Sequence, residues 1–190
     1  MTMHHYMIRI ILLSNLVIFS CYAIEELKIL KGNDLINDLP LELNLKNIYF
    51  KSFNEVYRSH WSMEFEEEVL EGFNTYIERF KQSNDMLLVA ATMDDALAGW
   101  ILFSKDQQRV IVDIICISPE YQRKGLGKKL IFSFRECWSE VTNLAVLTRK
   151  INAFSPLFYE SLGFRKTNFM LPEYNSAEVQ GYELALLSLR

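Results

Sequence analysis

The apolar positions of the chain follow two different periods, which together predict an α/β protein. In residues 64–81 they recur at every third or fourth position and so share one face of a helix; they are Phe65, Val69, Phe73, Tyr76, Ile77 and Phe80. Residues 44–61 are also helix-like. Residues 109–118, RVIVDIICIS, form instead an almost unbroken apolar, β-branched run. Such a run is typical of a central strand that is buried on both faces.

Shorter segments predict further elements. We expect a first strand from Ile24, which ends at the turn residues after Leu30, and a β-hairpin across residues 86–105. After residue 125 the apolar positions again have helical spacing, and they are Leu126, Leu130, Ile131, Phe134 and Trp138.

The last third of the chain alternates between strand and helix patterns. Residues 144–150 predict a strand and residues 155–163 a short helix, in which Ser155 is the expected N-cap and Gly163 the stop. Two final strands are expected at 164–171 and 181–189. The order predicts an α/β (α+β) fold with a mostly antiparallel mixed sheet of six to seven strands, flanking helices and one central βαβ crossover.

The first 23 residues differ from the rest. They contain one basic residue, Arg9, no acidic residue, and an apolar core from Ile10 to Phe19 that is too short to span a bilayer comfortably. This pattern is typical of a secretory signal peptide cleaved after Ala23, with a hydrophobic N-terminal anchor or a wrongly assigned start as alternatives. Phe19 fits a lipoprotein signal poorly. We therefore expect residues 1–23 to form a signal peptide or anchor, and 24–190 to form one domain.

Composition limits the functional classes. The chain has 190 residues, of which 50% are hydrophobic, enough for one domain with a real core. Its net charge of −4 argues against nucleic acid as the main partner. The cysteines and histidines show no metal-ligand spacing, so no metal is expected. Cys116 and Cys137 are best interpreted as small buried hydrophobic residues.

The segment YQRKGLGKKL, residues 121–130, follows the buried strand and has the features of an anion site. Gly125 and Gly127 allow the backbone to approach a ligand, and the first N–H groups of a helix lack internal partners. Gln122, Arg123, Lys124 and Lys128 add donors and positive charge. Neither the Walker loop nor the dinucleotide fingerprint fits this spacing. A plain strand-to-helix turn is the alternative.

Residues 122–127 follow the pattern Gln/Arg-x-x-Gly-x-Gly/Ala, which resembles the acyl-CoA loop of the GNAT superfamily of N-acetyltransferases. A second, independent segment, NAFSPLFYESLGF at 152–164, resembles the family's Asn-x-x-Ala-x-x-Leu-Tyr-x-x-x-Gly-Phe segment. The positions in register are Asn152, Tyr159, Gly163 and Phe164, whereas Ser155 replaces Ala and Phe158 replaces Leu. The resemblance extends over residues 24–190, and these two segments carry nearly all of its specificity.

The resemblance implies an N-acetyltransferase that moves an acetyl group from acetyl-CoA, its co-substrate, to a primary amine. The pyrophosphate would lie on the backbone N–H groups of residues 123–128, and the pantetheine arm would pair with the central strand. The implied cofactor-binding residues are Ile115, Cys116, Ile117, Gln122, Arg123, Lys124, Gly125, Leu126, Gly127, Lys128, Asn152 and Tyr159.

Two residues are candidates for catalysis. Tyr159 matches the family tyrosine that protonates the departing thiolate; otherwise it is a core aromatic. Asp113 is the only ionisable residue within the apolar run 110–117, and we expect it to be a general base or, alternatively, a hydrogen-bonded strand residue. The acidic cluster Glu64, Glu66, Glu67, Glu68 and Glu71 can attract a cationic amine or simply form a solvated helix face.

The sequence leaves several alternatives open. The acceptor can be a small amine, a polyamine, a peptide N-terminus or a protein lysine. A non-catalytic acyl-CoA-binding domain and an exported interaction protein are the rival functions, and a monomer and a homodimer are both open. The N-terminal segment suggests export or membrane contact, whereas use of acetyl-CoA suggests a cytosol.

Overall fold

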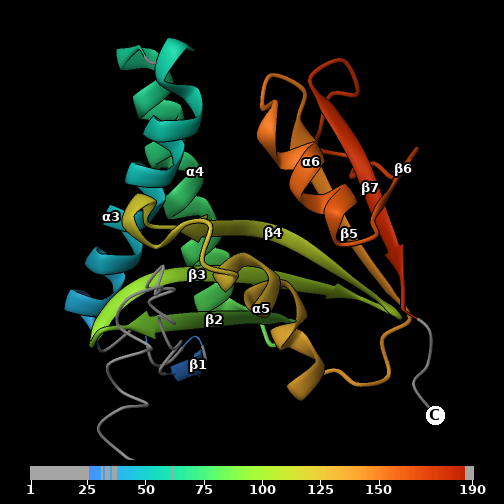
Figure 1. The fold of residues 1–190 in the computed structure, drawn as a ribbon, viewed down its shortest axis with the longest axis horizontal. Coiled ribbons are helices and arrows are strands. Elements are labelled where there is room, and N and C mark those ends of the chain that lie inside the picture. The colour runs from blue at the N-terminus through green and yellow to red at the C-terminus, as the bar shows by residue number, and fades with distance from the viewer. Residues whose placement is uncertain (1–25, 31, 33–34, 36–37, 61, 187–190) are drawn as a thin grey trace, which may run out of the picture.

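The computed structural model describes residues 26–30, 32, 35, 38–60 and 62–186 (Figure 1). The predicted signal or anchor segment, 1–23, lies outside these residues. In the described ranges, no helix is both long enough and apolar enough to cross a membrane.

Within the described residues, seven strands form one sheet, in the order β1-β2-β3-β4-β5-β7-β6. Every neighbouring pair is antiparallel except β4 and β5, which are parallel and joined by the expected crossover. The strands are β1 (Glu26–Leu30), β2 (Met86–Met93), β3 (Ala96–Asp106), β4 (Arg109–Ile117), β5 (Asn143–Arg149), β6 (Arg165–Thr167) and β7 (Val179–Ala185). The predicted mixed, mostly antiparallel sheet is thereby confirmed.

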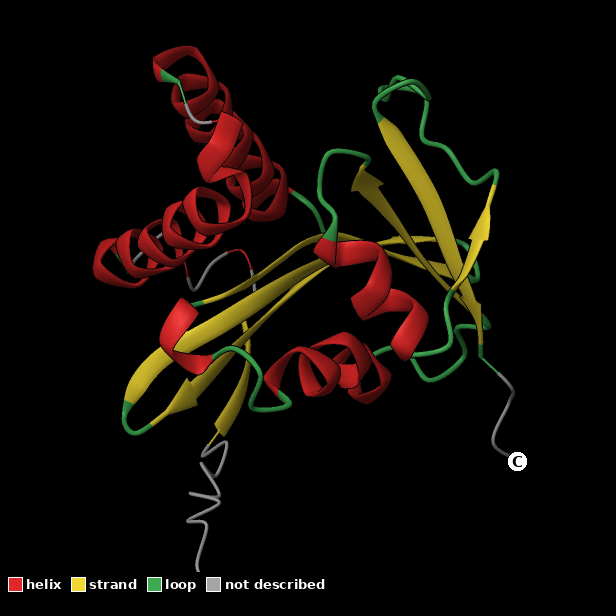
Figure 2. Cartoon of the chain, turned by 45° about the horizontal axis from the view of Figure 1, so that its top comes forward, coloured by secondary structure: helices red, strands yellow, loops and turns green. Residues whose placement is uncertain are grey.

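Helices cover both faces of this sheet (Figure 2). On one face lie α3 (Leu39–Tyr57) and α4 (Met63–Gln82), whose apolar stripe includes the buried Val69, Phe73, Ile77 and Phe80. On the other face lie α5 (Leu126–Phe132) and α6 (Phe154–Ser161). The largest fully buried side chain is Trp100, which packs under α3 and donates its indole N–H to the Leu45 carbonyl at 3.0 Å.

A β-bulge in β4 positions the site. In the pairing with β3, Leu102 lies opposite Ile114 and Phe103 opposite Val112, so Asp113 is an extra residue. Val112 packs on the α5 face, whereas Ile114 packs on the α3–α4 face. The bulge therefore switches the face to which successive side chains point, as bulges next to functional sites commonly do.

Beyond this bulge, β4 and β5 part. Their parallel pairing ends at Val112 and Val146, and the remainder of each strand runs on without the other (Figure 1). The backbone of β4 from Asp113 to Ile117 consequently borders an opening on its β5 side.

Several local expectations are corrected by the structure. The α3 helix begins at Leu39, five residues before the predicted start, because Asp38 accepts a hydrogen bond from the Leu41 N–H and Pro40 lies in the first turn. The helix after residue 125 is regular only to Phe132 and continues as a 3₁₀ turn, η3 (Ser133–Glu136). Strand β6 has three residues rather than the eight of segment 164–171. Cys116 is buried as expected, but Cys137 is exposed.

Candidate active site

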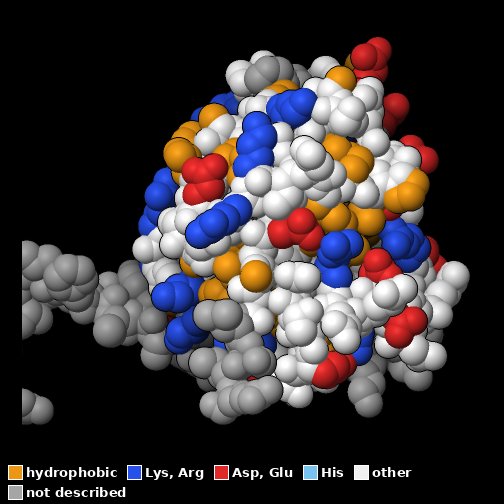
Figure 3. All heavy atoms as spheres, turned by 90° about the vertical axis from the view of Figure 1, so that its right-hand side faces the viewer, with side chains coloured by type: hydrophobic (Ala, Val, Ile, Leu, Met, Phe, Trp, Pro, Cys, Tyr) orange, Lys and Arg blue, Asp and Glu red, His pale blue; other side chains and the backbone are white. Residues whose placement is uncertain are grey.

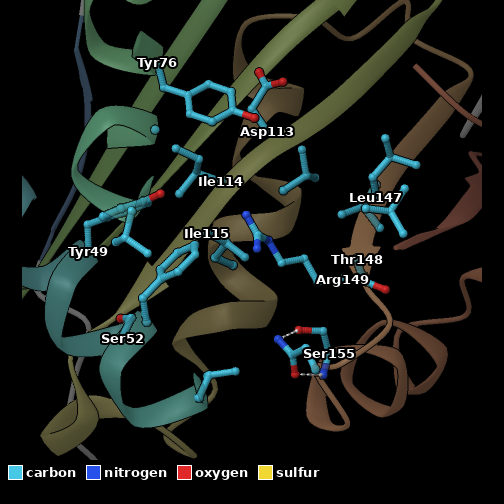
Figure 4. Close-up of a pocket in the computed structure, with 18 of the residues that line it drawn as sticks. Tyr49, Ser52, Tyr76, Asp113, Ile114, Ile115, Leu147, Thr148, Arg149 and Ser155 are labelled. Carbon is cyan, nitrogen blue, oxygen red and sulfur yellow. Dashed lines mark hydrogen bonds between the residues drawn. The ribbon is translucent and has the colours of Figure 1, made fainter. Parts of the chain in front are cut away.

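The parting of β4 and β5 opens into a cavity of about 550 Å³ (Figure 4). Its walls come from α3, α4, β4, β5, α6, the loop between β6 and β7, and the start of β7. Residues that the sequence singled out, Asp113, Ile115, Asn152 and Tyr159, line this one cavity. The fold therefore brings together the strand run and the downstream segment, which are separated along the chain by the whole of α5.

The loop after β4 begins the second half of the site. The Ile117 carbonyl accepts hydrogen bonds from Ser52 Oγ at 2.9 Å and from Gln122 Nε2 at 3.2 Å. The Gln122 side chain is thus turned back onto its own strand. Lys124 lies with its ammonium 5.1 Å from the centre of the Tyr121 ring, and Lys128 is exposed on the first turn of α5.

Two loop residues adopt backbone conformations that L side chains rarely adopt. Arg123 has φ 61° and Gly125 has φ 82° at the N-cap of α5. Leu126 is buried and anchors the helix to the core. A β-carbon at Gly127 would meet the Phe158 ring at 3.0 Å and Ile117 Cδ1 at 3.2 Å. The absence of a side chain at 127 therefore lets α5 pack closely against α6 and β4.

Asn152 caps α6, and the expectation that Ser155 does so is wrong. The Asn152 Oδ1 accepts from the backbone N–H groups of Phe154 and Ser155, both at 3.0 Å, and its Nδ2 donates to Ser155 Oγ at 2.5 Å (Figure 4). A side-chain oxygen that accepts from the first free N–H groups of a helix stabilises its start. Asn152 thus joins the end of β5 to the helix that carries Tyr159.

The C-terminal end of α6 is closed as expected. Gly163 has φ 92°, its N–H donates to the Glu160 carbonyl at 2.9 Å, and the Phe164 N–H donates to the Tyr159 carbonyl at 3.1 Å. This pair of bonds is a Schellman motif, which favours glycine at the left-handed position. The helix is therefore fixed at both ends.

Tyr159 is held by ring contacts and points into the interior. It is 4% exposed, and its ring centre lies 5.1 Å from that of Phe158 and 5.3 Å from that of Phe164. Burial, followed by the nearby Cys116 thiol and the Tyr57 phenol, raises the pKa of Tyr159 above its usual value of 10.0. The phenol accordingly keeps its proton at neutral pH and can act as a donor.

Asp113 lies at another end of the cavity, close to Tyr76 (Figure 4). Burial raises the pKa of Asp113 from 3.8 to about 6, an effect that a hydrogen bond from Ser104 and the charge of Arg79 oppose and that Glu173 reinforces. Its Oδ2 atom is buried and has no hydrogen-bond partner among the described residues. Asp113 is therefore a largely buried carboxylate that faces a cavity.

Arg149 crosses the cavity from β5 to α4 (Figure 4). Its guanidinium pairs with Glu68 and lies 5.6 Å from the centre of the Phe65 ring. Of the acidic cluster on α4, only Glu68 and Glu71 line the cavity. The other three members, Glu64, Glu66 and Glu67, are exposed outside the lining.

Sequence reasoning missed four side chains of the site: Tyr57, Tyr76, Arg149 and Tyr174. Tyr57, at the end of α3, makes a hydrogen bond with Asn152, and Tyr76 makes one with Tyr174. Tyr76 belongs to the apolar stripe of α4, so its periodicity indicated core packing alone. No local pattern signals the others, because their partners are far away in sequence.

The described residues contain no group of three or more His, Cys, Asp or Glu side chains that could hold a metal ion. Cys116, the one buried cysteine of β4, faces the α3–α4 side of the sheet, and burial raises the pKa of its thiol.

Comparisons with known proteins agree with this geometry. The family model described as the acetyltransferase (GNAT) domain matches residues 55–180. The ribosomal protein bS18 alanine N-acetyltransferase of Salmonella typhimurium is 29% identical over 111 residues, which is 56% of this chain and 72% of that protein.

Solved structures show the same fold. The PaiA N-acetyltransferase of Thermoplasma acidophilum, solved with coenzyme A, is 19% identical, with a TM-score of 0.68 over 85% of this chain and 99% of that one. The S18 alanine N-acetyltransferase of Escherichia coli is 20% identical, with a TM-score of 0.54 over 85% of this chain and 92% of that one. At these identities the likeness concerns the fold.

Proposed function

Because the chain belongs to the GNAT family of acetyltransferases, whose members use acetyl-CoA, we propose that it acetylates a primary amine bound in the cavity between α4 and β5. The observation that carries this proposal is the parting of β4 and β5 directly beside the loop 122–128, with Tyr159 at the parting. The same geometry gives no support to the rival interaction-protein reading, in which the loop would be only a turn.

The residues present fit acetyl-CoA, which supplies the acetyl group as a reactive thioester. The β5-facing side of Asp113–Ile117 has no strand partner in the described part of the chain, and a peptide-like arm can add to such an edge. Thr148, on the opposite side of the parting, has a buried hydroxyl without a partner among the described residues. The loop 122–128 offers backbone N–H groups and the basic side chains of Arg123, Lys124 and Lys128 to the pyrophosphate.

Tyr159 is proposed as the general acid that protonates the departing sulfur. Its phenol lies near Cys116 on β4 and near Tyr57, so it is at the parting and not on the surface. Asn152 orients this group indirectly, because it fixes the start of α6 and makes a hydrogen bond with Tyr57. Contact of Asn152 with the pantetheine arm remains part of the proposal.

For Asp113 the sequence-based hypothesis is a general base. With a pKa of about 6, the carboxylate is ionised at neutral pH and able to accept a proton. Asp113 is three residues along β4 from Cys116, roughly 10 Å at the usual strand rise. A proton from an amine near Tyr159 would therefore have to reach Asp113 through water. As a base, Asp113 would affect the turnover of every amine acceptor.

The proposal is tested by Tyr159→Phe, which removes the hydroxyl and keeps the ring contacts. We expect the rate of thiol release from acetyl-CoA, measured with a saturating amine, to fall at least about tenfold. The reason is that general acid catalysis increases the rate on the order of a hundredfold or more. The acetyl-CoA affinity, measured by calorimetry, should stay near wild type.

Tyr57→Phe is the matched control, since it removes the neighbouring phenol instead. Unchanged turnover in Tyr159→Phe would remove Tyr159 from the mechanism, and a selective loss in Tyr57→Phe would assign the acid to Tyr57. Failure of wild-type protein to bind acetyl-CoA would contradict the proposal as a whole.

The finer expectations about cellular context also stay proposals. They are a cleaved signal or anchor at residues 1–23, membrane contact through that segment alone, a domain over 24–190, and a homodimer. The named substrate of the bacterial relatives, a ribosomal protein alanine, makes a protein N-terminus one candidate acceptor for this chain.

A further inference from the structure

The Asp113 end of the cavity holds a buried carboxylate that receives a hydrogen bond from the neutral Ser104 side chain and forms no ion pair with a described residue. The carboxylate lies on the β4 bulge, and no described residue makes a hydrogen bond to its buried Oδ2. Arg79 and Glu173 act on it through space with opposite sign. Because a buried carboxylate without an ion-pair partner is costly, a bound cation would stabilise this end of the cavity.

Two tyrosines build the wall beside this carboxylate. Tyr76 on α4 and Tyr174 in the loop between β6 and β7 share a hydrogen bond between their hydroxyl groups, and both line the cavity. The Tyr76 ring points toward Asp113 (Figure 4). Aromatic rings next to a carboxylate suit an alkylammonium group, because the methylenes pack on the rings while the charge meets the carboxylate.

The lining of the cavity carries more carboxylates than basic side chains. The lining contains the carboxylates Glu68, Glu71, Asp113 and Glu173 and the guanidinium groups Arg79 and Arg149. Arg149 is neutralised by Glu68. On the outer face seen from the side of β6 and β7, by contrast, basic and acidic side chains are mixed (Figure 3). A cationic ligand is therefore favoured inside the cavity.

The distance between the two ends sets the size of such a ligand. Asp113 and Cys116, whose thiol acts on the pKa of Tyr159, are three residues apart along β4, which is roughly 10 Å. An extended chain advances roughly 1.2 Å per bond, since three bonds span about 3.5 Å. Two amines joined by four methylenes are thus about 6 Å apart, and a hydrogen bond to Asp113 adds about 3 Å.

We propose that the acceptor is a linear alkyl diamine, whose second ammonium group binds Asp113 beside the Tyr76–Tyr174 pair while the first amine reaches the thioester near Tyr159. This inference rests on the proposed acetyl transfer and adds a binding subsite to it. One proton leaves the reacting ammonium for water before attack, and an N–C bond forms as the C–S bond breaks. The sulfur takes the Tyr159 proton, the nitrogen gives up its second proton, which restores the phenol through water, and the products are the monoacetylated diamine and coenzyme A.

The experiment compares acceptors that differ only in the second charge. Full-length protein with saturating acetyl-CoA is given 1,3-diaminopropane, 1,4-diaminobutane, 1,5-diaminopentane or butylamine, and thiol release is followed. We expect diaminobutane to exceed butylamine at least tenfold in kcat/KM, with an optimum within the series. In Asp113→Asn the ratio of the two values should fall at least tenfold, mainly through a higher KM for the diamine. Glu67→Gln, which removes an exposed α4 carboxylate outside the cavity, should retain the wild-type ratio.

The outcomes separate this inference from the proposed function. Equal kcat/KM for butylamine and the diamines, with transfer intact, would overturn the diamine subsite and leave acetyl transfer standing. A uniform loss of kcat for all amines in Asp113→Asn would assign Asp113 as the base and overturn the subsite as well. As a measurement that needs no turnover, diaminobutane should raise the melting temperature of the wild-type complex with coenzyme A and not that of Asp113→Asn. Absence of that shift in wild type also counts against the subsite.

Discussion

Replacing Asp113 by Asn should change the stability of the protein in a way that depends on pH. The folded state holds the Asp113 proton up to about pH 6, whereas an unfolded chain releases it near pH 3.8. Between these values the folded state binds more protons than the unfolded state, so the free energy of unfolding falls as pH rises through this window. The loss of stability caused by burying the Asp113 charge is fully present above about pH 7 and absent well below pH 3.8.

The magnitude follows from the two pKa values. Their difference corresponds to at most about 3 kcal/mol, at roughly 1.4 kcal/mol per pKa unit. Asn carries no charge to bury, and any cost of its amide is independent of pH. The difference in unfolding free energy between variant and wild type should therefore grow in favour of the variant by up to about 3 kcal/mol between pH 3.5 and pH 7.5. For a chain of this size that is roughly 6–12 °C in melting temperature.

Thermal melts of wild type, Asp113→Asn and Glu67→Gln across this pH range would measure the effect. Glu67→Gln shows how much the melting temperature changes with pH when an exposed carboxylate is removed. The groups that face Asp113, namely Ser104, Arg79, Glu173 and Tyr76, are the same in all three proteins. A difference between Asp113→Asn and wild type that is flat with pH, or that favours wild type as pH rises, would refute the conclusion that Asp113 is a buried carboxylate without an ion-pair partner.

Two further substitutions test the loop and the helix that carry the site. Gly127→Glu should abolish acetyl-CoA binding, measured by calorimetry, and lower the free energy of unfolding by about 1–3 kcal/mol, because its β-carbon would press on Phe158 and Ile117; normal affinity in folded Gly127→Glu would place the pyrophosphate elsewhere. Asn152→Ala should cost about 0.5–2 kcal/mol in denaturant unfolding, since it removes the oxygen that caps Phe154 and Ser155. It should also lower kcat more than it weakens acetyl-CoA binding, and unchanged stability would mean that Asn152 does not hold α6 in place.

The sequence by itself determined the features that depend on neighbours a few residues away. The stripe of α4 identified a helix packed on the sheet, because 3.6-residue periodicity is a local property of the chain. Gly163 predicted the end of α6, because the left-handed backbone conformation that ends a helix favours glycine. The loop 122–128 and the segment 152–164 indicated the acyltransferase family for the same reason, as each is a contiguous stretch with a fixed local geometry.

Only the tertiary structure decided how these stretches meet. The β-branched run 109–118 predicts a regular strand. The bulge at Asp113 is a property of the pairing between β4 and β3, and the pattern of residues along one strand does not predict it. That bulge and the end of pairing at Val112 open the cavity. The partners of the site are likewise remote: Tyr76 meets Tyr174 and Arg149 meets Glu68 across 98 and 81 residues. Contacts at such separations depend on how the helices pack on the twisted sheet. The position of Asp113 in a charged cavity therefore follows from the fold, and no local sequence pattern predicts it.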